Sequence, residues 1–474
     1  MNVIANLIRT RSKMKPVFPL IVCLIVFASM PCLSSAADEP LDVNLAENAL
    51  ELAEQVGRWL ADNTVPQPEG ITWPDDVKNP EAISYDLASG VAGKVLYFVA
   101  LYRATENPDY LDLALGGADY LVATLQDPVV FEGNQRKASL YTGVSGIGVA
   151  LMHVQHHARQ TKYRNAIVKV IRLLDEWGVS DAQGLHWSDE FNDLIYGDAG
   201  TTLFLSWYAE QTGDEHALDM AHRGAQFLLG QADESADGKF WYFRRGKPFN
   251  LPNFSHGTAG VTYVLATVAA QTNDESLRLG AQAGFDYIKS IAETEGGLLR
   301  IPYGWGSESW DGLYEFGWAH GLAGTTSKFV RLQQTGIDAE SAAEFERLSR
   351  HTLQNINLPG PPAPPFAEPS TPLDLRFGRA GVLTLVGEWS IDSTITDNVA
   401  ELRKALWSHI EQAAIRDERT AHWEVDAPEF MGGGRAAYTG IFHGAAGIGL
   451  AVLRMHARAS GLPPYVDLPD HPIK

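Results

Sequence analysis

The sequence predicts an all-α protein, a closed (α/α) toroid in which a ring of inner helices is surrounded by a ring of outer helices. Three observations lead to this fold class. A Gly-x-x-Gly element recurs seven times, with the first glycines 53 to 66 residues apart, and each copy is followed by an apolar stretch. Between the copies lie longer segments that have helical spacing and one polar face. Strand-like alternation is scarce, and the longest extended candidate is Lys239–Phe243.

The apolar stretches are expected to be the inner helices. Examples are Val261–Ala270 and Ile448–Met455, which are apolar almost all round, as buried helices are. The third residue of every Gly-x-x-Gly is Ala or Ser, and glycine lets the helix tips crowd together near the axis. First-turn N–H groups then point into the mouth of the ring. The first glycines are Gly90, Gly143, Gly197, Gly257, Gly321, Gly378 and Gly444.

The amphipathic segments are expected to be the outer helices. Leu45–Leu60 is one, and Tyr163–Trp177 is another, with Ile167, Val170 and Leu174 on one stripe. Seven such pairs at near-constant spacing favour closure of the ring over an open α-solenoid.

Two segments do not belong to these pairs. Pro359–Pro372 contains seven prolines, so a surface loop is expected before the sixth inner helix.

Residues 1–36 combine four basic residues, an apolar run over Val17–Met30 and small residues at 34–36, which is the layout of a signal peptide. The run is short for a membrane span of roughly 20 residues, although an uncleaved anchor remains an alternative. We therefore expect an exported protein, periplasmic or extracellular, with a single domain over residues 37–474.

Composition excludes several classes of function. The chain has 37 Lys and Arg against 58 Asp and Glu, a formal charge of −21, which argues against nucleic acid and anionic membranes as partners. Both cysteines, Cys23 and Cys32, lie in the predicted signal peptide. A disulfide framework or a cysteine-rich zinc module is therefore excluded.

The residue before each first glycine occupies an equivalent place in every repeat. In order these residues are Ser89, Thr142, Tyr196, His256, His320, Phe377 and His443. Three are histidines, which we expect to point into one shared mouth. A helix N-terminus disfavours the cationic imidazole, and the neutral form binds metals or acts as a base. The alternative is that each histidine only caps its helix.

Acidic, aromatic and basic residues in the connectors are candidates for binding a substrate in the same mouth. They include Asp193 and Trp310, with Tyr196 among the residues before the glycines. Arg379 and Arg435 are rarer there and can grip a carboxylate.

The motifs resemble those of the lanthionine synthetase C-like (LanC-like) family over about residues 45–460. The sequences Ser-His-Gly-Thr-Ala-Gly, Gly-Trp-Ala-His-Gly-Leu-Ala-Gly and Phe-His-Gly-Ala-Ala-Gly occur in that order. The resemblance implies a toroid that adds a cysteine thiol to dehydroalanine or dehydrobutyrine. It also implies a zinc ion in the mouth, held by two cysteines and one histidine, that activates the thiol.

The chain departs from the family at the zinc ligands. The two cysteine positions hold Ala319 and Phe442, and only His443 keeps a matching ligand position. His256 matches the acid/base histidine of the family, and Asp193 is nearest to its functional acid. A rebuilt zinc site would need His256, His320 and His443 to converge within about 2.1 Å of one point.

Three functions follow as expectations. The first is an exported LanC-like protein that binds or modifies a peptide without the family's zinc, and that is either active or degenerate. The second is a carbohydrate-active toroid enzyme with paired carboxylates, in which Asp189 or Asp193 acts with Glu308, Asp311 or Glu315. The third is a non-catalytic binding module.

Overall fold

The computed structural model describes residues 43–134, 136–355, 373–388, 399–426 and 434–471. The predicted signal peptide and the predicted loop Pro359–Pro372 lie outside these residues. Both therefore remain predictions from the sequence.

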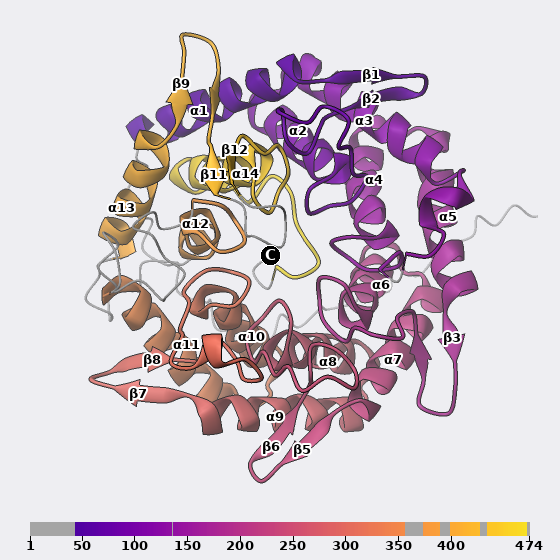
Figure 1. Cartoon of the computed structure of the whole chain (residues 1–474), viewed down its shortest axis with the longest axis vertical. Coiled ribbons are helices and arrows are strands. Elements are labelled where there is room, and N and C mark those ends of the chain that lie inside the picture. Colours follow the sequence, from indigo (N-terminus) through magenta and orange to yellow (C-terminus); the bar gives the residue numbers. More distant parts are fainter. Residues whose placement is uncertain (1–42, 135, 356–372, 389–398, 427–433, 472–474) are drawn as a thin grey trace, which may run out of the picture. The chain divides into compact units, whose positions relative to one another are not determined.

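Fourteen α-helices within the described residues alternate between two concentric rings (Figure 1). The inner ring is α2 (Val91–Thr105), α4 (Val144–Ala158), α6 (Asp198–Thr212), α8 (Thr258–Thr272), α10 (Leu322–Thr335), α12 (Arg379–Glu388) and α14 (Ala445–Ala459). The outer ring is α1 (Val43–Asp62), α3 (Pro108–Thr124), α5 (Thr161–Trp177), α7 (Glu215–Gly230), α9 (Glu275–Ile291), α11 (Ala339–Asn355) and α13 (Val399–Gln412). The prediction of an (α/α) toroid is confirmed.

Glycines begin the inner helices because no larger residue fits there. A Cβ atom on Gly257, the N-cap of α8, would lie 1.3 Å from the carbonyl oxygen of Leu251. In the first turn of α14, a Cβ atom on Gly447 would lie 1.7 Å from the carbonyl oxygen of Ile441. The chain before each helix thus packs directly against the helix start, which brings the preceding residues close to the axis.

Backbone hydrogen bonds join neighbouring repeats through the segments just before the glycines. The N–H of Ser255 donates to Ala319 O at 2.9 Å, and the N–H of Ala319 donates to Arg376 O at 2.8 Å. The series returns to its beginning, since the N–H of Phe442 in the last repeat donates to Ala88 O in the first at 2.9 Å. This bond closes the ring.

Short hairpins follow most outer helices and tie them to the next repeat. They are β1–β2 (Val65–Gln67, Gly70–Thr72), β3–β4 (Val179–Ser180, Leu185–His186), β5–β6 (Asp233–Ser235, Gly238–Phe240), β7–β8 (Glu293–Glu295, Leu298–Arg300) and β9–β10 (Ile415–Arg416, Ala421–His422). A sixth pair is β11–β12 (Val425–Asp426, Arg435–Ala436). The predicted extended segment Lys239–Phe243 is thus strand only up to Phe240, because Trp241 turns into the core.

A tryptophan after the hairpin anchors four of the repeats. The indole N–H of each donates to a carbonyl 13 residues earlier, at 2.7 to 2.9 Å. The four tryptophans are Trp73, Trp187, Trp241 and Trp423, and their acceptors lie near the carboxyl ends of α1, α5, α7 and α13.

The segment after α14 runs into the middle of the ring of inner helices (Figure 1). Tyr141 donates its hydroxyl to Asp470 at 2.8 Å, and His153 Nε2 lies 2.8 Å from Asp467 O. A cavity of about 30 Å³ beside Tyr141, Trp318 and Asp470 is left in the interior. Described residues after α14 therefore pack against the inner helices on the inside of the toroid.

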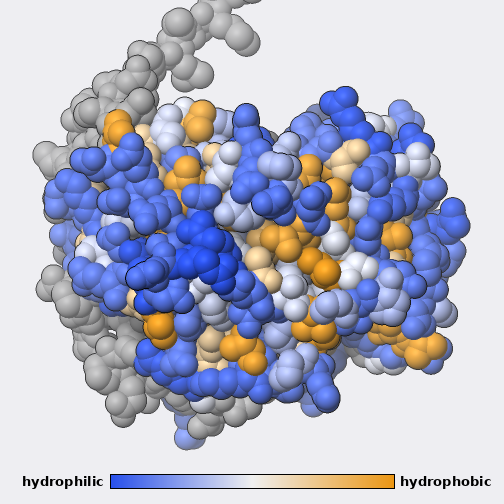
Figure 2. Space-filling model, turned by 90° about the horizontal axis from the view of Figure 1, so that it is seen from above, coloured by the Kyte–Doolittle hydropathy of each residue, from blue (hydrophilic) through white to orange (hydrophobic). Residues whose placement is uncertain are grey.

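The outer face seen from above is mostly hydrophilic, with apolar residues in smaller groups (Figure 2). No helix among the described residues has both the length and the apolar character needed to cross a membrane.

Candidate active site

Two aspartates hold the turns that lead into α6 and α12. Each lies four residues before the first glycine of its repeat, so its carboxylate can accept N–H groups of the turn. Asp193 accepts from the N–H of Tyr196 at 3.2 Å, and Asp374 accepts from the N–H of Phe377 at 2.7 Å. Both aspartates are buried.

The same two carboxylates contact the imidazoles of the following repeats. His256 Nδ1 lies 2.5 Å from Asp193 Oδ2, and His443 Nδ1 lies 3.2 Å from Asp374 Oδ2. Both histidines are 4 % exposed. The toroid therefore contains two Asp–His pairs in the same register, three repeats apart.

Arg376 contacts the first of these pairs from the opposite side. Its Nη2 donates to His256 Nε2 at 2.9 Å. Because a guanidinium only donates, Nε2 is the acceptor, and the ring proton of the neutral imidazole is on Nδ1, facing Asp193. Burial and then the charge of Arg376 hold the pKa of His256 well below its usual value. Burial raises the pKa of the Asp193 carboxyl above its usual value.

His320 lies beside His256 but makes a different set of contacts. The two ring centroids are 5.1 Å apart, and the ring of Tyr303 lies 4.6 Å from His320. Burial, and then the neighbouring His256, lower the pKa of His320 well below its usual value. Phe377 stacks on His320 at 5.9 Å and lies 5.7 Å from His443. The three histidines thus form an arc with a phenyl ring inserted before the last one.

The residues present do not fit the zinc site that the family implies. The structure describes no group of three or more His, Cys, Asp or Glu residues placed to hold a metal. Ala319 is fully buried and has no donor atom, and Phe442 stacks on Tyr141 at 4.7 Å. Both ring nitrogens of His256 already have partners, one of which is a cation. A three-histidine site is therefore not formed in this arrangement.

The predicted substrate-binding residues lie at different distances from the imidazoles. Tyr196 stacks on His256 with ring centroids 5.3 Å apart, and the Arg136 guanidinium carbon lies 4.0 Å from the centroid of the Tyr196 ring. Trp310 packs 5.6 Å from Tyr303, which in turn contacts His320.

The two predicted arginines differ from each other in their surroundings. Arg379 begins α12 and is half-buried, and burial lowers its pKa. Arg435 is on the exposed strand β12, where its ion-pair partner is Glu424 at 3.7 Å. Arg379 therefore lies three residues from Arg376, whereas Arg435 is tied to a surface hairpin.

Among the candidate carboxylates, Asp193 and Glu315 belong to this cluster. Burial raises the pKa of Glu315 to about 7, against the opposing charge of Arg376. Glu315 Oε2 is buried with no hydrogen-bond partner among the described residues. Asp189 is instead exposed over 84 % of its side chain.

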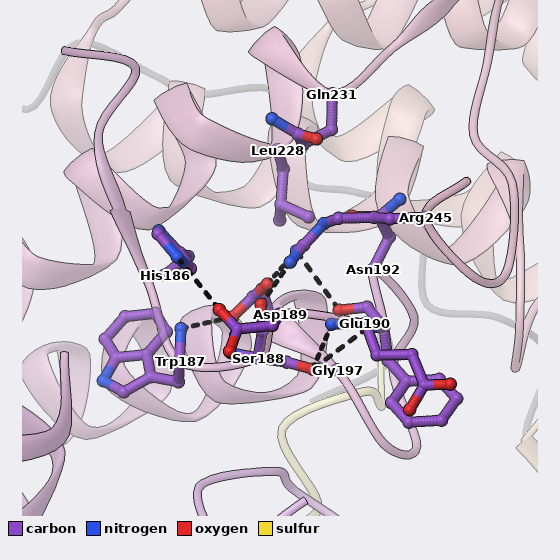
Figure 3. Close-up of polar contacts among 12 residues, drawn as sticks. His186, Trp187, Ser188, Asp189, Glu190, Asn192, Gly197, Leu228, Gln231 and Arg245 are labelled. Atoms are coloured by element: carbon purple, nitrogen blue, oxygen red, sulfur yellow. Dashed lines mark hydrogen bonds and ion pairs between the residues drawn. The ribbon is translucent and has the colours of Figure 1, made fainter. Parts of the chain in front are cut away.

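A second arginine fixes the loop that carries Asp193 and Tyr196 (Figure 3). Arg245 Nε donates to Asn192 Oδ1 at 2.8 Å, and Nη2 donates to Phe191 O at 3.3 Å. Arg245 also forms an ion pair with the buried Asp198. In this loop Asn192 is thus held by Arg245, and Asp193 faces His256.

The sequence reasoning missed Arg376 and Asp374. Asp374 stands in the same place before its glycine as Asp193 does, so a comparison of the repeats position by position was the signal that could have found it. Arg376 stands two residues before its glycine, at the place that Ala319 and Phe442 occupy in their repeats. It therefore lies between the two positions at which the family has cysteines.

The class defined by this fold and its motifs is confirmed by comparison with known families. The model of the family described as "Lanthionine synthetase C-like protein" matches residues 81–361. The chain therefore belongs to the LanC-like family. No curated protein sequence matches the chain significantly.

Solved structures are similar to this chain at low sequence identity, and the fold is shared with nisin cyclase. Nisin cyclase is 14 % identical with a TM-score of 0.58, and the match covers 91 % of this chain and 97 % of that one. A sugar epimerase from a ruminal bacterium is 11 % identical with a TM-score of 0.48, covering 89 % of this chain and 100 % of that one. The GH76A α-1,6-mannanase from Salegentibacter sp. HEL1_6 is 15 % identical with a TM-score of 0.42, covering 69 % and 91 %.

Proposed function

We propose that this chain is an exported LanC-like protein that binds a peptide in the mouth of the toroid and transfers protons to it, without the zinc of the family. The observation that carries the proposal is the row Asp193–His256–Arg376, with contacts of 2.5 Å and 2.9 Å. It retains the acid/base pair that the family resemblance implies, and it places a fixed cation next to the imidazole.

The chemistry of this row favours one half of the family's reaction. Adding a thiol across dehydroalanine forms a bond from sulfur to Cβ and places a proton on Cα. The Asp193–His256 pair, whose carboxyl has a raised pKa, is suited to supply the proton in that second step, and a guanidinium stabilises negative charge on a neighbouring carbonyl oxygen. Thiolate formation is the step for which the family uses its metal. We therefore expect peptide binding to be retained and cyclisation to be slow.

The test uses a peptide that carries one dehydroalanine and one cysteine. Ring closure leaves the mass unchanged, so free thiols are counted by alkylation and mass spectrometry, and binding is measured by calorimetry. We expect binding, and a loss of thiol that is faster than without protein and is slowed at least tenfold in His256→Ala. His216→Ala is the matched control, because this histidine lies exposed on the outer helix α7. Absence of binding rejects the proposal, and binding without thiol loss supports the non-catalytic module.

A carbohydrate-active enzyme is the second candidate, and Glu315 favours it. A buried carboxyl with a pKa of about 7 is about half protonated at neutral pH, so it can act as a general acid for glycoside cleavage. Tyr303 and Trp310 provide aromatic faces close by. Release of reducing sugar from a panel of oligosaccharides, abolished in Glu315→Gln, would establish this function in place of the first.

A further inference from the structure

The two Asp–His pairs differ in what their Nε2 atoms contact. His256 Nε2 accepts a hydrogen bond from Arg376. His443 Nε2 is buried and has no hydrogen-bond partner among the described residues. The two histidines occupy equivalent positions in their repeats but differ in hydrogen bonding. The Nε2 of His256 has a donor, whereas the Nε2 of His443 has none among the described residues.

The orientation of His443 follows from Asp374. The carboxylate accepts from the N–H of Phe377 and contacts His443 Nδ1, so the Nδ1–H tautomer is the one that this pair favours. Nε2 then carries the lone pair. A buried acceptor without a donor is unfavourable, and in native proteins such an atom usually has a partner that is a ligand or a water.

The surroundings of His443 indicate the chemistry of that partner. Phe377 and Phe442 flank the imidazole, with ring centroids 5.7 and 6.4 Å away. The Arg376 guanidinium lies 4.8 Å from the first ring and 5.4 Å from the second. His320, whose ring also packs against Phe377, has a buried Nδ1 that lacks a partner among the described residues. Two histidines with an unpaired ring nitrogen therefore contact one phenyl ring, close to one positive charge.

We propose that His443 is the imidazole that holds the peptide backbone, and that its Nε2 accepts the N–H of a peptide amide. The amide carbonyl then lies toward the positive charge of Arg376, and the two phenyl rings cover its apolar flanks. Asp374 is a positioning residue, which holds the tautomer. This inference rests on the proposed function, and it gives His443 the role of a hydrogen-bond acceptor where the family resemblance gives it that of a metal ligand.

Nitrogen NMR of the purified protein with labelled histidine tests the proposal. His443→Gln assigns the His443 signals, and we expect them to show a protonated Nδ1 and an unprotonated Nε2. Adding the dehydroalanine peptide should shift the Nε2 signal of His443 and leave that of His256 in place. Asp374→Asn should mix the two tautomers and weaken peptide binding about tenfold. His216→Gln, on the outer helix α7, is the control and should change neither.

The outcomes separate this inference from the proposal on which it rests. Peptide binding that leaves the His443 signal unmoved, or an Nε2–H tautomer in the free protein, overturns the inference alone. A hydroxyl-rich oligosaccharide that moves the signal when the peptide does not overturns the assignment to an amide. Absence of peptide binding overturns both. Circular dichroism of each variant confirms that it is folded, and the tautomer in the unmodified protein does not depend on any variant.

Discussion

The Arg376 guanidinium donates to His256 Nε2 at 2.9 Å, across 120 residues of sequence. The bond places a permanent positive charge against a nitrogen that a metal or a substrate proton would otherwise occupy. After burial, the charge of Arg376 is the largest cause of the lowered pKa of His256, which gives a direct prediction.

Replacing Arg376 with methionine should raise the pKa of His256 toward its ordinary value. The charge of Arg376 is the second cause of the lowered pKa, after burial, so the pKa should rise but stay below about 6.5. Histidine NMR titration measures it. Arg435→Met removes a charge from an exposed hairpin and should leave the His256 signal unchanged. A pKa that stays the same or falls would show that Arg376 does not control the imidazole.

Asparagine in place of Asp193 should destabilise the fold. The carboxylate accepts from His256 and from the turn before α6, and an amide nitrogen would bring two donors together. We expect a loss of about 2 kcal/mol in the free energy of unfolding. Chemical denaturation measures it, with the exposed Asp189→Asn expected to change stability by less than about 0.5 kcal/mol. Equal effects of the two substitutions would contradict this role.

Lys328 on α10 is fully buried, and methionine at this position should stabilise the protein. Its Nζ has no hydrogen-bond partner among the described residues and lies 4.4 Å from the centroid of the Phe329 ring. Burial holds the pKa of Lys328 well below its usual value, so the folded chain binds fewer protons at this site than the unfolded chain. Protonation thus favours unfolding.

The pH dependence of stability therefore has a definite sign at Lys328. Stability should fall as pH decreases from about 10.4, the pKa of an unfolded lysine, to the lowered pKa of the folded state. In the Lys328→Met variant, this contribution to the pH dependence of stability should be absent. Denaturation at several pH values measures the difference, and a variant that is less stable than the parent at pH 7 would refute the prediction.

Glu315 should make stability depend on pH in the direction opposite to that of Lys328. Its pKa of about 7 exceeds that of an unfolded glutamate, so the folded chain keeps a proton there that the unfolded chain loses. The contribution of Glu315 to stability is complete at low pH and declines as pH rises from about 4.3 to 7. In denaturation experiments, the stability of the Glu315→Gln variant should depend less on pH over this range than that of the parent. A slope identical to that of the parent would place Glu315 in contact with water.

The repeat pattern predicted the helices well because it depends on contacts within each unit. α5 begins at Thr161 and ends at Trp177, close to the predicted segment Tyr163–Trp177. The first glycine of a repeat precedes its inner helix, because a side chain there would strike the backbone before the helix. The period of the hydrophobic residues and the steric exclusion at the glycines both depend on residues within one repeat. A single sequence is therefore enough to predict them.

The partners of the site residues could not be predicted in the same way. That His256 lies next to His320, and that Phe377 stands between His320 and His443, followed from their equivalent positions in the repeats. The contact between Arg376 and His256 depends on how far two repeats are rotated about the axis. The spacing of residues within a single repeat does not determine that rotation. The contact of Arg376 with His256 therefore could not be predicted.

The bond from Phe442 to Ala88 also limits how this protein can change its length. In an open array a terminal unit can be gained or lost while the others keep their neighbours. Here every unit has a neighbour on both sides, so deleting any one would leave two unmatched faces and a circle of the wrong circumference. Copy number is therefore fixed by geometry, and engineering of this scaffold has to exchange units one for one.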